Sequence, residues 1–163
     1  MADGFDLNKL TLSEKIIGGA TFVFLVATFL PWFSVDLGII GSADGNGWDV
    51  GFFWAGFPLI FGLLMCAQIA AARFSPQTKL PELPWPQVHL GLGVAAFAIV
   101  VLKLLVGEDA GPFDADRDYG LFLAVIAAAG LAYGGWLKWQ EGGRATTAGG
   151  LGGPDTTPPP AAP

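Results

Sequence analysis

The stretch Val50–Ala72, VGFFWAGFPLIFGLLMCAQIAAA, decides the fold, because it runs for 23 residues without a charged side chain. A bilayer core about 30 Å thick needs about 20 mostly apolar helical residues to cross it. The chain has three further apolar stretches of similar length. Their only charged residues are Lys103 and Lys138, each near the end of its stretch. The sequence therefore predicts four membrane-spanning helices, at about Ile16–Val35, Val50–Ala72, Val88–Val106 and Tyr119–Trp139.

The composition of the whole chain also favours lipid as its solvent. Of the 163 residues, 53% are hydrophobic and 13% are charged, whereas average soluble domains carry about 25% charged residues. Strands with unpaired backbone groups cannot cross lipid, and the sequence lacks the alternating segments of a membrane barrel. We therefore expect an all-α fold, an integral membrane four-helix bundle. The first apolar run is too long and bulky for a typical cleaved signal peptide.

The chain divides into three parts. Residues 1–15 form an N-terminal lead, residues 16–139 the transmembrane domain, and residues 140–163 a Gly/Pro/Thr-rich tail that we expect to be disordered. Thr11 and Glu14 have the spacing of a capping box. Pro31 is expected to kink or end the first helix, leaving Phe33–Val35 free to be extended. The Gly-rich loop 36–49 is compatible with a hairpin.

Positive charges set the expected orientation. Cytoplasmic loops of membrane proteins carry an excess of Lys and Arg. Six of the eight Lys and Arg residues lie on one side of the predicted spans, whereas Lys103 and Arg117 lie toward the other side. We therefore expect both termini to be cytoplasmic, in the plasma membrane. The six residues on the cytoplasmic side are Lys9, Lys15, Arg73, Lys79, Lys138 and Arg144.

Aromatic residues fall at the predicted borders of the bilayer. Indole rings prefer the headgroup level, where an apolar ring and a polar N–H are both accommodated. All six Trp are therefore interpreted as interfacial anchors. Trp32, Trp48, Trp54 and Tyr119 are expected at the outer border, and Trp85, Trp136 and Trp139 at the inner one.

Small residues at four-residue spacing predict where helices touch. Lipid tails are as apolar as Leu, so helices associate in membranes through close packing at small side chains. We expect these faces to contact neighbouring helices of the same chain, a second copy or another membrane protein. They comprise Gly120, Ala124, Ala128 and Ala132, the pair Gly130 and Gly134, the stripe Gly62, Cys66 and Ala70, and the pair Gly91 and Ala95.

Few polar residues lie within the spans. Lys103 is close enough to its span end to reach the outer surface, where Glu108 or Asp109 would neutralise it. His89 and Gln68 lie near the inner border and are candidates for a hydrogen bond to each other. Thr21 and Thr28 are expected to bond back to their own helix.

The sequence carries no convincing site for a metal, a cofactor or catalysis. Asp114, Asp116 and Asp118 match the first positions of a calcium loop, but the required Gly and the closing Glu are missing. The default interpretation is a solvated acidic loop with Arg117 as counter-charge. A single Cys excludes an intramolecular disulfide, and one Cys with one His cannot form a Cys/His zinc site within one copy. A net charge of −6 disfavours nucleic acid. We expect no catalytic, cofactor-binding or metal-binding residues and no enzymatic activity.

A set of short motifs resembles a known group of proteins. They are Glu14–Gly19, Phe29–Ser34, Trp48, Leu83–Pro86 and Gly135–Glu141, in that order along the chain. In this order they resemble small four-span integral membrane proteins of actinobacteria. The resemblance covers about residues 12–141. It implies a bacterial plasma membrane location and supplies neither an activity nor catalytic residues.

Together these features favour a multi-pass plasma-membrane protein without enzymatic activity. The leading hypothesis is an accessory or scaffold component of the cell envelope, with the lipid bilayer as its surroundings. The alternative is a subunit of a small oligomeric transporter or channel, which would need a polar stripe facing a shared interior. Thr21, Thr28, Gln68 and Lys103 are the candidates for that stripe. A membrane enzyme ranks last.

Overall fold

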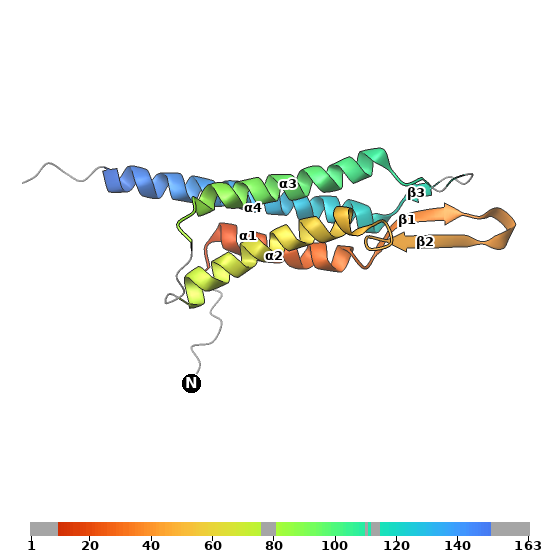
Figure 1. The fold of residues 1–163 in the computed structure, drawn as a ribbon, viewed down its shortest axis with the longest axis horizontal. Helices are drawn as coiled ribbons and strands as arrows, with labels where there is room; N and C mark the ends of the chain where they lie inside the picture. The colour runs from red at the N-terminus through yellow and green to blue at the C-terminus, as the bar shows by residue number, and fades with distance from the viewer. Residues whose placement is uncertain (1–9, 76–80, 110, 112–114, 151–163) are drawn as a thin grey trace, which may run out of the picture.

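The computed structural model is built around four helices that run alternately up and down (Figure 1). It describes residues 10–75, 81–109, 111 and 115–150, with the backbone alone for 145–150. Each helix packs against its neighbours in sequence, and α4 also packs against α1. The beginning of α1 and the end of α4 therefore lie at the same end of the bundle, here called the terminal end. The helices are α1 (Leu12–Ala27), α2 (Phe52–Phe74), α3 (Trp85–Val106) and α4 (Tyr119–Gly150).

A small antiparallel sheet covers the opposite end of the bundle, here called the sheet end (Figure 1). The central strand pairs with one strand from its own hairpin and with one strand from the loop before α4. The prediction of an all-α fold is therefore wrong at this end, although the hairpin in loop 36–49 is confirmed. The strands are β1 (Pro31–Asp36), β2 (Ser42–Asn46) and β3 (Ala115–Arg117), in the order β2-β1-β3, with the short 3₁₀ helix η2 (Gly38–Ile40) between β1 and β2.

Helix α1 is shorter than the predicted span Ile16–Val35. The Thr11–Glu14 capping box is confirmed and starts the helix at Leu12. The helix ends at Ala27, and Pro31 opens β1 instead of continuing it, because proline has no N–H for a helical hydrogen bond. A helix of 16 residues is about 24 Å long, less than the bilayer core.

Three helices of the described chain are long and apolar enough to cross a membrane. They are α2, α3 and the Tyr119–Arg144 part of α4. Helix α3 begins at Trp85, three residues before its predicted span, with Pro86 in the first turn where proline is tolerated. Helix α4 continues through Gly150, so the first part of the expected disordered tail is helical; residues 151–163 lie outside the described residues.

Trp32 fixes the sheet to the bundle. Its side chain is fully buried, and its indole N–H donates a 2.8 Å hydrogen bond to the carbonyl of Ala27. The interpretation of all six Trp as interfacial anchors is therefore wrong for Trp32, because its ring contacts only protein. The structural reason is that Gly47, with no side chain, lets the β2 loop close over the indole ring.

Helix α4 is the centre of the bundle because glycines let three neighbours approach its backbone. A Cβ at Gly120 would lie 2.4 Å from the Pro31 carbonyl oxygen, and one at Gly134 would lie 2.6 Å from Ile17. Toward α3, Gly135 meets the backbone of His89 and Gly93 meets that of Leu131. The expected α3 contact residue, Gly91, instead faces open space.

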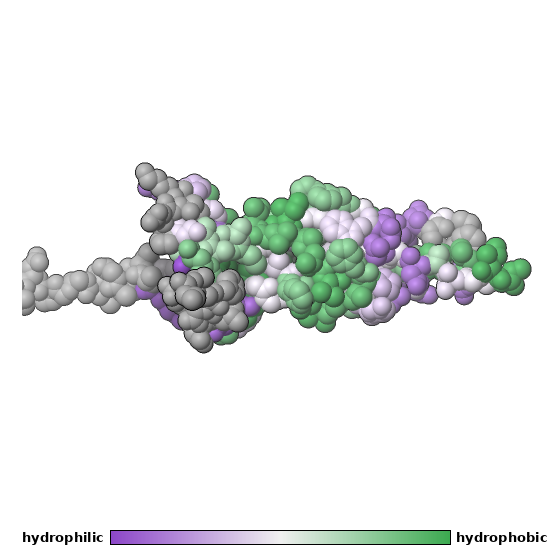
Figure 2. All heavy atoms as spheres, turned by 90° about the horizontal axis from the view of Figure 1, so that it is seen from below, coloured by the Kyte–Doolittle hydropathy of each residue, from purple (hydrophilic) through white to green (hydrophobic). Residues whose placement is uncertain are grey.

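On the face shown in Figure 2, apolar residues cover the middle of the molecule, and hydrophilic residues lie on both sides of them. Large apolar side chains are exposed on every helix, as the surface of a membrane-spanning bundle requires. Examples are Phe22, Leu63, Val94 and Ile126, with exposed fractions of 66%, 50%, 49% and 66%.

The two glycines of α3 provide a matched test of the α3–α4 contact. We expect Gly93→Ala to lower the free energy of unfolding by about 1–3 kcal/mol, because the new methyl group would overlap the Leu131 carbonyl, 2.5 Å away. Gly91→Ala should be neutral or stabilising, since nothing lies within 4 Å and alanine favours helix. Thermal unfolding in detergent measures both; equal melting temperatures would exclude this contact.

Candidate functional site

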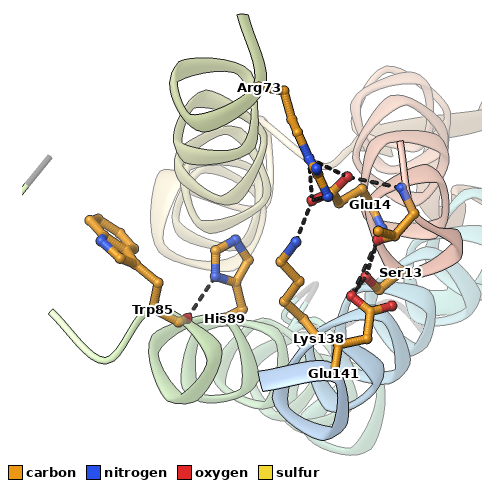
Figure 3. A network of polar contacts seen from close by, with 8 residues as sticks. Ser13, Glu14, Arg73, Trp85, His89, Lys138 and Glu141 are labelled. Atoms are coloured by element: carbon orange, nitrogen blue, oxygen red, sulfur yellow. Dashed lines mark hydrogen bonds and ion pairs between the residues drawn. The ribbon is translucent and has the colours of Figure 1, made fainter. Parts of the chain in front are cut away.

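The densest polar network of the described residues lies at the terminal end and centres on Glu14 (Figure 3). The Glu14 side chain is only 2% exposed. Its carboxylate accepts hydrogen bonds from Arg73 of α2 at 3.0 and 3.1 Å and from the Lys138 ammonium of α4. It also accepts one from the Thr11 backbone N–H at 2.9 Å. One carboxylate thus connects three helices.

A second carboxylate balances the charge of this network. Glu141 of α4 accepts hydrogen bonds from the hydroxyl groups of Ser13 at 2.9 Å and Thr11 at 3.3 Å. Two cations, Arg73 and Lys138, therefore face two carboxylates, and the network has no net charge. Ser13 and Glu14 are adjacent at the start of α1, so the capping box also positions the residues that hold α4.

The surroundings of Glu14 favour its charged form. Burial raises the pKa of its carboxyl, but the hydrogen bonds from Lys138, Arg73 and the Thr11 backbone together outweigh burial. The pKa of Glu14 therefore lies below its ordinary value of 4.5. We call the contacts of Glu14 with Arg73 and Lys138 the ionic clamp, because they connect α1, α2 and α4. Removing one partner of a buried ion pair leaves an uncompensated charge, so the loss of Glu14 should destabilise the fold.

His89 lies beside the Glu14 network, on the first turns of α3 (Figure 3). Its Nδ1 lies 2.7 Å from the Trp85 carbonyl oxygen, one turn earlier in α3. A carbonyl oxygen only accepts, so Nδ1 carries the proton of this bond. The Nε2 atom is buried and has no hydrogen-bond partner within the described structure. The predicted bond between His89 and Gln68 is not formed; the two residues line the same cavity.

Lys103 lies at the sheet end and is also neutralised. Its Nζ lies 2.5 Å from Glu108 Oε2, so the structure selects Glu108 from the two predicted partners. The ammonium also lies 5.2 Å from the ring centre of Trp54 and 5.3 Å from that of Phe33, within the range of cation–π attraction. Its side chain is only 6% exposed. Neither aromatic partner was identifiable from spacing, because β1 brings Phe33 to Lys103.

The acidic segment before α4 has local structural roles where it is described. Asp116 lies in β3, and the Asp118 carboxylate accepts from the Tyr119 backbone N–H at the start of α4. Among the described residues, Arg117 forms no ion pair with a carboxylate of this segment. Its guanidinium donates to the carbonyls of Leu104 and Leu105, at 2.6 and 3.3 Å, and thereby caps α3. Asp114, the first residue of the partial calcium motif, lies outside the described residues.

The polar residues proposed for a transport stripe do not converge. Thr21 and Thr28 donate to the carbonyls of Ile17 and Leu25 in their own helix, as predicted. Gln68 lies toward the terminal end, whereas Lys103 is paired at the sheet end. Thr21 also accepts a weak bond from Cys66 at the α1–α2 contact, consistent with Cys66 as a packing residue.

Glu14→Gln tests the clamp. We expect the variant to lose about 2–3 kcal/mol of stability at pH 7, since Arg73 and Lys138 lose their shared anion but stay partly accessible to water. A lowered pKa means that the charged Glu14 stabilises the fold above pH 4.5 and loses this effect as the pH falls through its folded-state pKa. The difference between wild type and variant should therefore shrink below about pH 4.5.

Glu82→Gln is the matched control, because Glu82 is exposed in the α2–α3 connection. Chemical or thermal unfolding in detergent between pH 3 and pH 7 provides the comparison. A stability loss of the same size in both variants, or a Glu14→Gln loss that does not depend on pH, would contradict the role of the carboxylate.

Comparison with known proteins found no match to this chain. No family model matches the chain, and neither a curated protein nor a solved structure matches it. The similarity to actinobacterial four-span proteins therefore stays a prediction from short motifs.

Proposed function

We propose that the chain is a multi-pass plasma-membrane protein without enzymatic activity, which serves as an accessory or scaffold component of the cell envelope. Its terminal end, with both chain termini, faces the cytoplasm, and its sheet end faces outward. In this arrangement α1 spans together with the turn that follows it and the start of β1. The actinobacterial resemblance agrees with this location.

Two features support the membrane location and orientation. Three long apolar helices, and an apolar middle flanked by hydrophilic residues on the face shown in Figure 2, match the cross-section of a bilayer. Arg73, Lys138 and Arg144 lie toward the terminal end, which agrees with the excess of positive charge expected on the cytoplasmic side.

The scaffold role is carried by one observation, an exposed isoleucine pair at the tip of a firmly held hairpin. Ile39 and Ile40 form the turn between β1 and β2 and have exposed fractions of 107% and 82%. Gly38 and Gly41 flank them with positive φ angles of 66° and 113°, a backbone conformation that glycine allows. Exposed apolar side chains on a fixed polar module are typical of a contact with another protein.

The transporter or channel alternative has less support. Membrane transport generally uses ionisable groups at depth that are free to exchange partners. In the described part of the chain, Lys103 is held by Glu108 and two rings, and Glu14 is held by two cations. These groups are committed to structure.

The orientation can be tested by cysteine labelling. In a Cys66→Ala background, an impermeant maleimide should label Ser42→Cys in intact cells, because Ser42 lies exposed in the outer hairpin. Ser75→Cys, exposed at the end of α2, should react only after the cells are permeabilised. Labelling of both in intact cells would reject the orientation, and recovery in the soluble fraction would reject the membrane location.

The hairpin role can be tested by site-specific crosslinking in cells of the native host. A photo-crosslinking residue at Ile39 should give a discrete adduct with a membrane or envelope protein, and Ile40→Ser in the same chain should reduce its yield several-fold. The same residue at Ala43, which is exposed on β2 but away from the tip, is the control. Identical adducts at both positions, or none at Ile39, would contradict a partner at the tip.

A further inference from the structure

The three-stranded sheet has two different faces. Successive side chains of a strand point to opposite faces, and residues paired across strands share a face. Phe33 of β1 and Arg117 of β3 are paired and therefore share one face. The ammonium of Lys103 in α3 lies 5.3 Å from the Phe33 ring centre, and Arg117 donates a 2.6 Å hydrogen bond to the Leu104 carbonyl in α3. This face is turned toward α3, so the other face is turned away from it.

The face turned away from α3 is acidic. Ser34 lies at its centre and pairs with Asp44 of β2 on one side and with Asp116 of β3 on the other. Asp36, two residues further along β1, lies on the same face and pairs with Ser42. All three aspartates are exposed, and none forms an ion pair in the described chain. Sheet spacing puts their main chains within about 10 Å of one another. We call this surface the acidic face.

The isoleucine pair at the hairpin tip adjoins the acidic face. The hairpin projects beyond the helices at the sheet end (Figure 1). Ile39 and Ile40 lie in its turn, between Asp36 and Ser42 of the acidic face, and both are strongly exposed. An exposed apolar group beside a polar surface has the composition of a protein interface, with an apolar core and a polar rim.

These two parts of the hairpin define the chemistry of a partner. We propose that the hairpin binds a protein whose surface carries Lys or Arg side chains beside an apolar pocket. The isoleucine pair occupies the pocket, and the basic side chains pair with the carboxylates of the acidic face. The inference rests on the scaffold role proposed above and specifies the partner of the same hairpin.

Charge complementarity selects a basic protein over two other occupants. A second copy of the chain would bring identical carboxylates against one another, and like charges in direct opposition are destabilising. Anionic lipid headgroups would be repelled in the same way. The one cation among the described residues of the sheet, Arg117, lies on the opposite face and is bonded to the end of α3.

Two neighbouring residues of β2 provide a matched test of the contact surface. Ser42 lies on the acidic face and Ala43 on the opposite face, and both are exposed. In cells of the native host, a photo-crosslinking residue at Ser42 should capture the same protein as one at Ile39. The same residue at Ala43 should not capture it.

Charge variants test the chemistry of the partner. Asp44→Asn combined with Asp116→Asn removes two carboxylates at nearly constant size, and the adduct yield at Ile39 should fall about two- to tenfold. Asp44→Glu combined with Asp116→Glu keeps both charges and should retain most of the yield. Asp109→Asn removes an exposed carboxylate outside the sheet and should leave the yield unchanged.

The possible failures are distinguishable. Capture at Ile39 without capture at Ser42 overturns the contact with the acidic face and leaves the tip contact standing. A Ser42 adduct with a second copy of the chain or with lipid overturns the choice of partner. An Ile39 yield that the double Asn variant leaves unchanged, or that Asp109→Asn lowers equally, overturns the role of charge. Absence of any adduct at Ile39 rejects the scaffold role itself.

Discussion

Direct backbone contact between α3 and α4 is the constraint on which the rest of the structure depends. In a membrane, helices gain nothing by hiding apolar surface from lipid, so they associate where small residues allow close approach. Gly93 and Gly135 supply that approach, and each lies against the backbone of the facing helix. Helix α4 then uses Gly134 to receive α1 and Gly120 to receive the start of β1.

Polar groups close the bundle at both ends and follow one rule. Each buried charge of the described chain has an opposite charge close by, as the high cost of unpaired ions in an apolar setting requires. At the terminal end, Glu14 collects Arg73 and Lys138 from two other helices. At the sheet end, Lys103 is held by Glu108 and by aromatic faces. Among uncharged groups of the described chain, two buried ring nitrogens, Nε1 of Trp48 and Nε2 of His89, form no hydrogen bond by geometry.

Local sequence signals predicted the local features well. The capping box, the end of the first helix near Pro31, the hairpin and the hydroxyl bonds of Thr21 and Thr28 depend on neighbouring residues, and all are present. The apolar runs also located the helices to within a few residues, except that α1 stops early and α4 continues to Gly150.

Features that depend on distant residues were not predictable from patterns. Strand β3 is a short, charged segment that pairs only because β1 lies beside it. The choice of Gly93 over Gly91 depends on the rotation of α3 against α4, which an apolar helix with little asymmetry does not reveal. In the candidate site, Glu14 signalled a cap, but its ion pairs with α2 and α4 come from folding.

The anchoring of the sheet couples the two sides of the membrane in the proposed orientation. Strand β1 follows α1 after the short turn 28–30, strand β3 leads within two residues into α4, and the two strands are bonded to each other. A force that tilts the hairpin therefore acts on α1 and α4, the two helices that carry Glu14 and Lys138. Load applied to the hairpin outside would therefore reach the Glu14 network inside through α1 and α4.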